Sequence, residues 1–160
     1  TMDYLDRDNI MTTRTFSKIY GLAGLRLGCG VADKEIISAL NKVREPFNVN
    51  LLAQEAALAA LDDEEYARFV RRETDKGKKF LYDELTKLDI SYVPSATNFI
   101  LVRLGTSAEE IYTKLLRSGV IVRYMKAWGL SEYIRVTIGT EDENKVFIDR
   151  LNLILKGQGA

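Results

Sequence analysis

Residues 15–28 read Thr15-Phe-Ser-Lys-Ile-Tyr-Gly-Leu-Ala-Gly-Leu-Arg-Leu-Gly28, and this stretch indicates both the fold and the chemistry of the chain. It brings Lys18, Arg26 and the hydroxyls of Thr15 and Ser17 into one short segment. A lysine amine bonds covalently to an aldehyde, while hydroxyls and a guanidinium donate hydrogen bonds to phosphate. We therefore expect this segment to hold a cofactor with an aldehyde and a phosphate tail, which is the chemistry of pyridoxal 5'-phosphate.

The place of Lys18 in the sequence favours a functional role over an ordinary surface lysine. It follows the β-prone residues 10–16 and precedes a series of glycines between Gly21 and Gly30. The pattern predicts a strand that ends in a flexible loop, and open α/β sheets bind ligands at such strand ends. The same glycines are also compatible with turns and close packing alone. They form neither a GxGxxG motif followed by a helix nor a P-loop.

The segment from Arg14 to Gly28 resembles the cofactor-lysine signature of class II, fold type I aminotransferases, and most closely that of the histidinol-phosphate aminotransferase family. The likeness continues through Val43-Arg-Glu-Pro-Phe-Asn-Val-Asn50, Gln54-Glu-Ala-Ala-Leu-Ala-Ala-Leu-Asp-Asp63 and Tyr133-Ile-Arg-Val-Thr-Ile-Gly139, so it covers essentially the whole chain. At Cys29, relatives often carry an aromatic residue instead. The resemblance implies an α/β fold: the C-terminal part of the large cofactor-binding domain, with a mainly parallel sheet, followed by a small α+β C-terminal domain.

The resemblance also implies roles for individual residues. Lys18 would bind pyridoxal 5'-phosphate covalently and move the α-proton of the substrate. The cofactor phosphate would be bound by Thr15, Ser17 and Arg26, and the acid group of the substrate by Arg135. The implied reaction is the transamination of histidinol phosphate with 2-oxoglutarate in histidine biosynthesis, which yields imidazole-acetol phosphate and glutamate.

Enzymes of this family are more than twice as long as this chain, and they place further cofactor-binding residues upstream of the lysine. The resemblance therefore implies the C-terminal half of a homodimeric enzyme, and we expect that half to be inactive on its own. One alternative is another enzyme of the superfamily, an aromatic amino acid aminotransferase or a threonine-phosphate decarboxylase-like enzyme. An alternative from a different class is a non-catalytic association module.

Two arginines lie within apolar strand-like segments near the C-terminus. Arg123 ends the run Gly119-Val-Ile-Val-Arg123, and Arg135 lies in the run Tyr133-Ile-Arg-Val-Thr137. An arginine in such a segment is costly to bury unless an anion or a carboxylate accompanies it. Two guanidiniums that converge on one group would favour a substrate with a phosphate. For Arg123, an outward-facing position on an edge strand is equally compatible with the sequence.

Three further residues have a functional and a structural interpretation. Asn98 is a candidate for substrate binding at the start of a strand, and it is equally suited to a turn. Tyr20 is a candidate for contact with the substrate, the cofactor or a neighbouring subunit, and it could equally be a packed aromatic. Trp128 lies in a predicted loop, where it could cover the site or only pack against its surroundings.

The composition excludes several classes of function. Lys plus Arg and Asp plus Glu balance at 23 each, so no excess of charge indicates a nucleic-acid partner. The single cysteine, Cys29, excludes an intrachain disulfide and fits a reducing compartment, and the absence of histidine argues against a metal site. We find no apolar run long enough for a membrane span and no signal-peptide pattern in residues 1–8. We therefore expect a cytoplasmic protein.

Helix signals alternate with strand signals along the chain. A buried strand is expected over 25–32, a hinge over 46–49, and short strands over 90–93, 98–104, 120–124 and 133–138. Helices are expected to begin at residues that can cap them: Asp33, Asn50, Asp63, and the capping boxes Ser107–Glu110 and Thr140–Glu143. Gly77 is expected to weaken the long helix that ends near Leu88. The inward face of the last helix is expected to comprise Val146, Phe147, Leu151, Ile154 and Leu155.

These signals suggest an organisation in three segments. With 160 residues, the chain is long enough for one domain or for one domain and part of another. We expect residues 1–48 to form the end of the large domain and residues 49–74 a helical segment between domains. Residues 75–160 are expected to form the small C-terminal domain.

Overall fold

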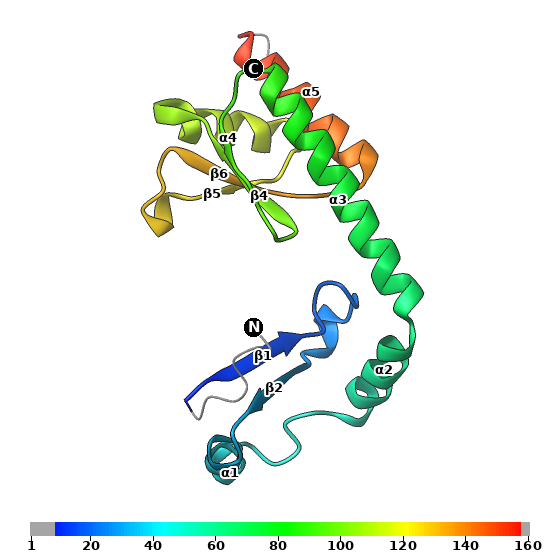
Figure 1. Ribbon diagram of the computed structural model, residues 1–160. Coiled ribbons are helices and arrows are strands. Elements are labelled where there is room, and N and C mark those ends of the chain that lie inside the picture. Colours follow the sequence, from blue (N-terminus) through cyan, green and yellow to red (C-terminus); the bar gives the residue numbers. More distant parts are fainter. Residues whose placement is uncertain (1–8, 158–160) are drawn as a thin grey trace. The chain divides into compact units, whose positions relative to one another are not determined.

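The computed structural model describes residues 9–157, and the chain divides into two compact units between Arg71 and Arg72 (Figure 1). Residues 1–8, where we expect no signal peptide, and residues 158–160 lie outside the described residues. The division into domains at residues 48 and 74 stays a prediction.

Two antiparallel strands form the sheet of the first unit. Strand β1 (Met11–Thr15) pairs with β2 (Gly28–Ala32), so that Met11 faces Ala32 and Thr15 faces Gly28. All strand pairs within residues 9–157 are antiparallel, so the expectation of a mainly parallel sheet is wrong for this part of the chain. The physical reason is that residues 16–27 form a closed loop that reverses the chain direction.

The second strand is also shorter and more exposed than the sequence predicts. Residues 23–25 form a 3-10 turn, η2 (Ala23–Leu25), so β2 begins at Gly28 and not at residue 25. None of the residues of β2 is buried. In the described part of the chain, β2 pairs with β1 alone, which leaves its other edge without a strand.

The three helices that follow begin at the residues predicted to cap them. Asp33 accepts a hydrogen bond from the Glu35 amide (2.7 Å) at the start of α1 (Lys34–Val43). The Asn50 side chain accepts a hydrogen bond from the Ala53 amide (2.8 Å) at the start of α2 (Leu51–Asp62). Such bonds satisfy amide groups that no helical carbonyl can reach. The cap of α3 (Glu64–Lys87) is Asp63, which accepts from the Tyr66 amide at 2.9 Å.

The second unit is a four-stranded antiparallel sheet with helices packed on one face. The strand order is β3 (Tyr92–Val93), β4 (Phe99–Arg103), β6 (Tyr133–Thr137) and β5 (Arg123–Tyr124). The strands pack on α3, α4 (Ala108–Arg117) and α5 (Glu141–Leu155) around a core that includes Leu81, Leu85, Ile100, Val102, Leu115, Ile134 and Leu151. Because side chains alternate along a strand, the residues between these core positions lie on the opposite face. That face carries Phe99, Leu101 and Arg135.

The two predicted capping boxes have different outcomes. Thr140 accepts a hydrogen bond from the Glu143 amide (3.4 Å), and the Glu143 carboxylate accepts from the Thr140 amide (2.7 Å), so this box is confirmed. The bond from the Thr140 amide holds the pKa of Glu143 below its ordinary value. Its contribution to stability is therefore present at neutral pH and is lost as the pH falls through that lowered pKa.

The box predicted at Ser107 is wrong. Ser107 makes no capping hydrogen bond, because it ends a 3-10 turn, η3 (Gly105–Ser107), that leads directly into α4. Its backbone angles (φ −84°, ψ 0°) differ from the extended conformation in which a capping side chain reaches back to the helix. The end of α4 matches the prediction, since Gly119 follows it with a positive φ of 82°.

The inward face of α5 differs in part from its prediction. Phe147, Leu151 and Ile154 are buried as expected, and Ile148 joins them. Val146 and Leu155 are half exposed, so their assignment to the inward face is wrong. Both lie at the edge of the buried stripe, where the period of 3.6 residues turns a side chain toward solvent.

Gly77 allows α3 to pack closely against the end of β6. A Cβ at this position would lie 2.7 Å from Ile138 Cγ2 and 2.8 Å from the side-chain nitrogen of Asn144. Asn144 is buried, and its amide group donates to the Gly139 carbonyl and accepts from the Gly139 amide, both at 3.0 Å. Gly77 is therefore a requirement of this packing, and the expectation that it only weakens the helix is incomplete.

We predict that Gly77→Ala destabilises the protein. Alanine favours a helix over glycine by about 1 kcal/mol, but overpacking typically costs about 1–3 kcal/mol, and here the close atoms include a buried amide with two hydrogen bonds. Urea denaturation measures the change in the free energy of unfolding. Lys76→Ala, on the exposed side of the same helix, is the control and is expected to change stability little. A Gly77→Ala protein as stable as the wild type would contradict the packing argument.

Candidate active site

The loop between β1 and β2 holds Lys18 at a defined position. The loop is tied to Phe16, a buried residue whose amide donates to the Leu27 carbonyl (3.2 Å) and whose carbonyl accepts from the Leu22 amide (3.0 Å). The Gly21 amide donates to the Lys18 carbonyl (2.9 Å), and Gly21 has a positive φ of 69° that glycine adopts without strain. Lys18 is thus exposed in a short loop that is closed by hydrogen bonds to the backbone of the buried Phe16.

The predicted phosphate-binding residues lie at the same end of this hairpin. Thr15 is the last residue of β1, and its hydroxyl oxygen accepts from the Ser17 amide (3.1 Å). Arg26 has a left-handed backbone (φ 55°), and its Nη1 donates to the Ala23 carbonyl (2.7 Å). The Thr15 hydroxyl keeps its own proton to donate, and within residues 9–157 most of the N–H groups of Arg26 are unused.

This donor set fits pyridoxal 5'-phosphate. Lys18 supplies a primary amine for the aldehyde, and no carboxylate in the described part of the chain pairs with it. Two hydroxyls and one guanidinium supply donors for a phosphate. Tyr20 packs on Phe16 within the same loop, with ring centroids 5.0 Å apart and planes 31° apart. Its part in substrate binding stays a prediction.

In the second unit, Arg123 and Arg135 are direct partners in the pairing of β5 with β6. Like charges that face each other across two strands are unfavourable unless another group compensates them. Within residues 9–157, neither guanidinium has an ion pair with a carboxylate. The Arg135 guanidinium lies over the Phe99 ring, 5.0 Å from its centroid, and the Arg123 guanidinium lies 5.6 Å from the centroid of Trp128. Two adjacent cations without an anion form a site suited to phosphate or carboxylate.

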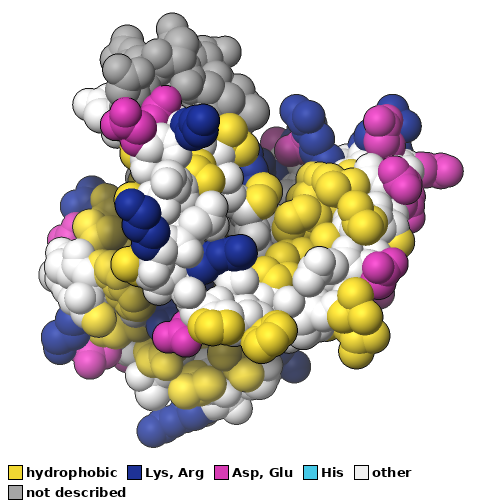
Figure 2. Space-filling view, turned by 90° about the horizontal axis from the view of Figure 1, so that it is seen from below, with side chains coloured by type: hydrophobic (Ala, Val, Ile, Leu, Met, Phe, Trp, Pro, Cys, Tyr) yellow, Lys and Arg dark blue, Asp and Glu magenta, His cyan; other side chains and the backbone are white. Residues whose placement is uncertain are grey.

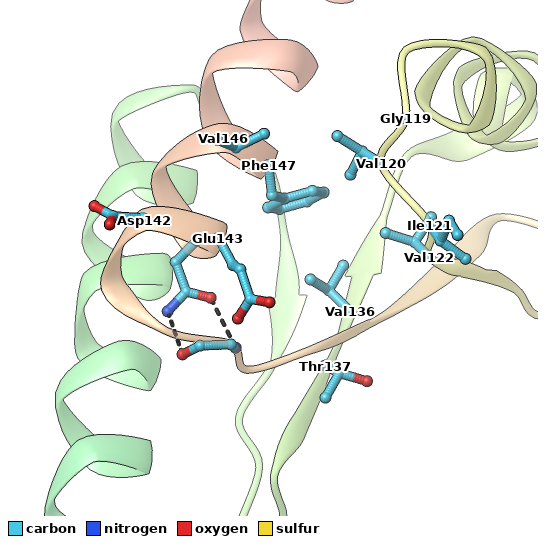
Figure 3. Close-up of a pocket in the computed structure, with 12 residues that line it drawn as sticks. Gly119, Val120, Ile121, Val122, Val136, Thr137, Asp142, Glu143, Val146 and Phe147 are labelled. Carbon is cyan, nitrogen blue, oxygen red and sulfur yellow. Dashed lines mark hydrogen bonds between the residues drawn. The ribbon is translucent and has the colours of Figure 1, made fainter.

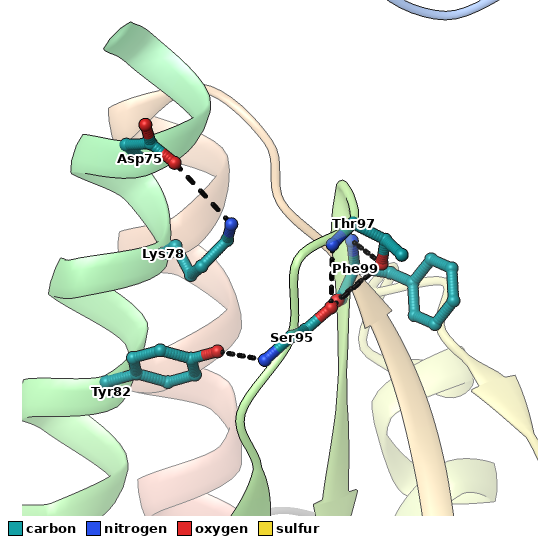
Figure 4. Close-up of polar contacts among 6 residues, drawn as sticks. All are labelled: Asp75, Lys78, Tyr82, Ser95, Thr97 and Phe99. Atoms are coloured by element: carbon teal, nitrogen blue, oxygen red, sulfur yellow. Dashed lines mark hydrogen bonds and ion pairs between the residues drawn. The ribbon is translucent and has the colours of Figure 1, made fainter. Parts of the chain in front are cut away.

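Asn98 lies in the turn that leads into β4, and the strand itself begins one residue later than predicted. Its carbonyl accepts from the Ile138 amide (2.9 Å), which links the start of β4 to the end of β6. A network of hydrogen bonds holds this turn to α3 through Tyr82, Ser95 and Thr97 (Figure 4). The role of the Asn98 side chain in substrate binding stays a prediction.

A pocket of about 490 Å³ lies elsewhere in the second unit, between residues 119–122 and the first turns of α5 (Figure 3). Its walls are mainly apolar and include Val120, Val136 and Phe147, and its only charged residues are Asp142 and Glu143. None of the predicted site residues lines it. An apolar pocket with two carboxylates is unsuited to a phosphate. The pocket is not among the expectations from the sequence, although the apolar run 119–122 beside an amphipathic helix is a signal for it.

Two classes of site are absent from the part of the chain that the structure describes. Residues 9–157 contain no group of three or more Cys, Asp or Glu residues arranged to hold a metal ion. No helix among these residues is both long enough and apolar enough to cross a membrane.

Residues 2–151 match the family model of aminotransferase class I and II, and the chain belongs to this family. It is 50% identical over 150 residues to histidinol-phosphate aminotransferase 2 of Carboxydothermus hydrogenoformans, a match that covers 94% of this chain and 41% of that protein. It is 52% identical over 149 residues to a histidinol-phosphate aminotransferase of Moorella thermoacetica, with coverages of 93% and 39%. The chain thus spans about two fifths of the length of these curated relatives.

A solved structure extends the likeness to three dimensions. The crystal structure of histidinol-phosphate aminotransferase from Sinorhizobium meliloti, in complex with pyridoxal-5'-phosphate, superposes with a TM-score of 0.87 at 28% identity. The match covers 96% of this chain and 43% of that chain. The fold of the described residues is therefore that of part of an aminotransferase.

Proposed function

We propose that the chain is part of a pyridoxal-phosphate-dependent aminotransferase that transfers the amino group of histidinol phosphate to 2-oxoglutarate in histidine biosynthesis. The observation that carries this proposal is the combination of an exposed lysine among phosphate donors with two facing arginines that have no carboxylate partner among residues 9–157. Lys18 and the phosphate donors around it suit the cofactor, and the two arginines suit a substrate with a phosphate. The relatives of about 50% identity support this choice of substrate.

Lys18 is the proposed catalytic residue. When bound, the cofactor supplies an electron sink for the negative charge that develops at the substrate Cα. The Nζ atom of Lys18 would anchor the cofactor through its aldehyde, and as a free amine it would take the proton from the substrate Cα. The bonds that tie the loop to Phe16 hold the lysine backbone in place during these steps.

Thr15, Ser17 and Arg26 are the proposed ligands of the cofactor phosphate. The left-handed backbone of Arg26 and its bond to the Ala23 carbonyl orient the guanidinium at the end of the hairpin. A guanidinium presents a planar fork that matches two phosphate oxygens, which a lysine does not offer.

Arg135 and Arg123 are the proposed ligands of the acid group and the phosphate of the substrate, with Asn98 and Tyr20 as further contacts. Their facing positions place two positive charges side by side on one face of the sheet. A phosphate with nearly two negative charges compensates both. The same pair accepts the side-chain carboxylate of glutamate, the product formed from 2-oxoglutarate.

We also propose that the whole protein is a cytoplasmic homodimer without nucleic-acid or membrane partners. The first unit exposes large apolar side chains, among them Val43, Leu52 and Phe47, whose side chain is almost fully exposed at 98%. Figure 2 shows hydrophobic side chains gathered at the surface between charged ones. Apolar patches of this kind are typically covered by further protein. The 160-residue chain alone is expected to be inactive.

The substrate is tested with the full-length protein loaded with pyridoxal 5'-phosphate. We expect glutamate to form from 2-oxoglutarate with histidinol phosphate as donor, with a kcat/KM roughly 100-fold or more above that with phenylalanine. A preference for phenylalanine would indicate an aromatic aminotransferase. Release of carbon dioxide from threonine phosphate would indicate a decarboxylase, and no turnover with any substrate would favour the association module.

A further inference from the structure

Two aromatic rings support the facing arginines, and the sequence analysis gave neither ring this role. Trp128 lies under Arg123 and Phe99 under Arg135. Both rings belong to the second unit and approach the arginine pair from opposite sides: Phe99 belongs to β4, on one side of β6, while Trp128 belongs to the 3-10 turn η4 (Lys126–Trp128), which follows β5.

The kind of contact decides what the arginines can bind. A carboxylate partner would occupy the N–H groups in the plane of a guanidinium. An aromatic ring instead attracts the positive charge through its π-electrons and takes up none of the conventional hydrogen-bond positions of the N–H groups. In the described part of the chain no carboxylate pairs with either arginine, and each guanidinium lies over a ring.

Local hydrogen bonds fix the backbone of Trp128, although 56% of the residue is exposed. The turn is anchored at Met125, a buried residue whose amide donates to the Tyr133 carbonyl (3.1 Å) at the start of β6. The Met125 carbonyl accepts from the amides of Trp128 (3.0 Å) and Leu130 (3.3 Å). The turn closes with Gly129 at a positive φ of 74°. The backbone of Trp128 is thus held by hydrogen bonds after the end of β5, and the ring is in contact with Arg123.

Phe99 is fixed by a different network (Figure 4). The hydroxyl of Tyr82, on α3, accepts from the Ser95 amide (2.8 Å), and the Ser95 hydroxyl accepts from the Thr97 amide (3.0 Å). The Thr97 hydroxyl donates to the Phe99 carbonyl (3.1 Å) and accepts from its amide (3.3 Å). These bonds connect the backbone of Phe99 to the helix behind the sheet.

We infer that Trp128 and Phe99 are positioning residues for the anionic group of the substrate: each ring holds one guanidinium by a cation–π contact and leaves its N–H groups free for that anion. This inference rests on the proposed function, in which the arginine pair binds phosphate. The rings offset the repulsion between the two arginines before the anion arrives. Binding then requires little rearrangement, because both guanidiniums are already held in place.

The test uses inorganic phosphate as a competitive inhibitor of the full-length, cofactor-loaded enzyme. Trp128→Leu removes the aromatic face but keeps apolar bulk, and it is expected to raise the Ki of phosphate and the KM of histidinol phosphate roughly 5- to 10-fold. Trp128→Phe is expected to restore most of the affinity. The kcat and the Ki of histidinol, which lacks the phosphate, are expected to change less than about twofold. Leu116→Ala, at an exposed apolar position of α4, is the control and is expected to leave all four constants unchanged.

A double-mutant cycle distinguishes positioning through Arg123 from a general structural effect. In the Arg123→Ala background, Trp128→Leu is expected to add no further rise in the Ki of phosphate, because the guanidinium that it supports is gone. An additive effect would overturn the inference, and so would an unchanged Ki in Trp128→Leu alone.

Phe99→Leu provides a second, independent variant, with the same expected rise in the Ki of phosphate through Arg135. If the wild type does not use histidinol phosphate, the proposed function fails, which is a separate result.

Discussion

Replacing Lys18 with alanine is expected to lower kcat by roughly 10⁴-fold, the largest effect that the site predicts. The variant loses both the covalent anchor of the cofactor and the base that removes the α-proton. Because the Lys18 side chain is exposed and its backbone bonds remain, the fold is expected to be unchanged. Steady-state kinetics with histidinol phosphate and 2-oxoglutarate measure the loss.

Two variants control for charge and for the loss of a lysine in general. Lys18→Arg keeps the positive charge but cannot bond to the aldehyde, so it is expected to be as inactive as Lys18→Ala. Lys42→Ala, on the exposed surface of α1, is expected to retain full activity. Substantial activity in Lys18→Arg would show that the positive charge, and not the covalent bond, is what the site requires.

Arg123→Ala is expected to discriminate between substrates. Arg123 is exposed on the edge strand β5. Losing its charged hydrogen bond to a phosphate costs about 1.5–3 kcal/mol, which corresponds to roughly a 10- to 200-fold loss in kcat/KM for histidinol phosphate. A donor with a single carboxylate and no phosphate is expected to lose much less, since Arg135 remains. Equal losses for both donors would show that Arg123 has a structural role.

Stability provides a second measurement for the same variant. Arg123 and Arg135 face each other as like charges, so removing one of them relieves a repulsion. The variant also loses the contact between Arg123 and the Trp128 ring, so its melting temperature is expected to stay close to that of the wild type. A clear decrease would show that Arg123 contributes to the fold and would remove the basis for assigning it to the substrate.

The helix starts could be predicted from the sequence because an N-cap depends on neighbouring residues. Asp33, Asn50, Asp63 and Thr140 each accept a bond from an amide two or three residues further on. At Ser107 the same reasoning fails, since a preceding 3-10 turn changes the backbone conformation. The mainly parallel sheet and the burial of residues 25–32 were also wrong, because strand direction and burial depend on partners distant in the sequence.

The candidate site could be predicted only in part. The residue types near Lys18 and the two arginines are visible in the sequence, and the structure brings the first group to one end of a hairpin and makes the arginines partners. The register that pairs Arg123 with Arg135 is set by the sheet and is not visible in either segment alone. The contacts of Trp128 and Phe99 depend on turns whose hydrogen bonds reach Tyr133 and Tyr82. The close packing at Gly77 is likewise a tertiary property.

The central claim is that Lys18 binds pyridoxal 5'-phosphate covalently in the full-length protein. Borohydride reduction of the cofactor-loaded protein converts the double bond between the lysine nitrogen and the cofactor into a stable single bond, and peptide mapping then locates the label. We predict that the label is found on Lys18, in the peptide that contains the loop between β1 and β2. A label on another lysine, or no label in protein that has bound the cofactor, would contradict the claim.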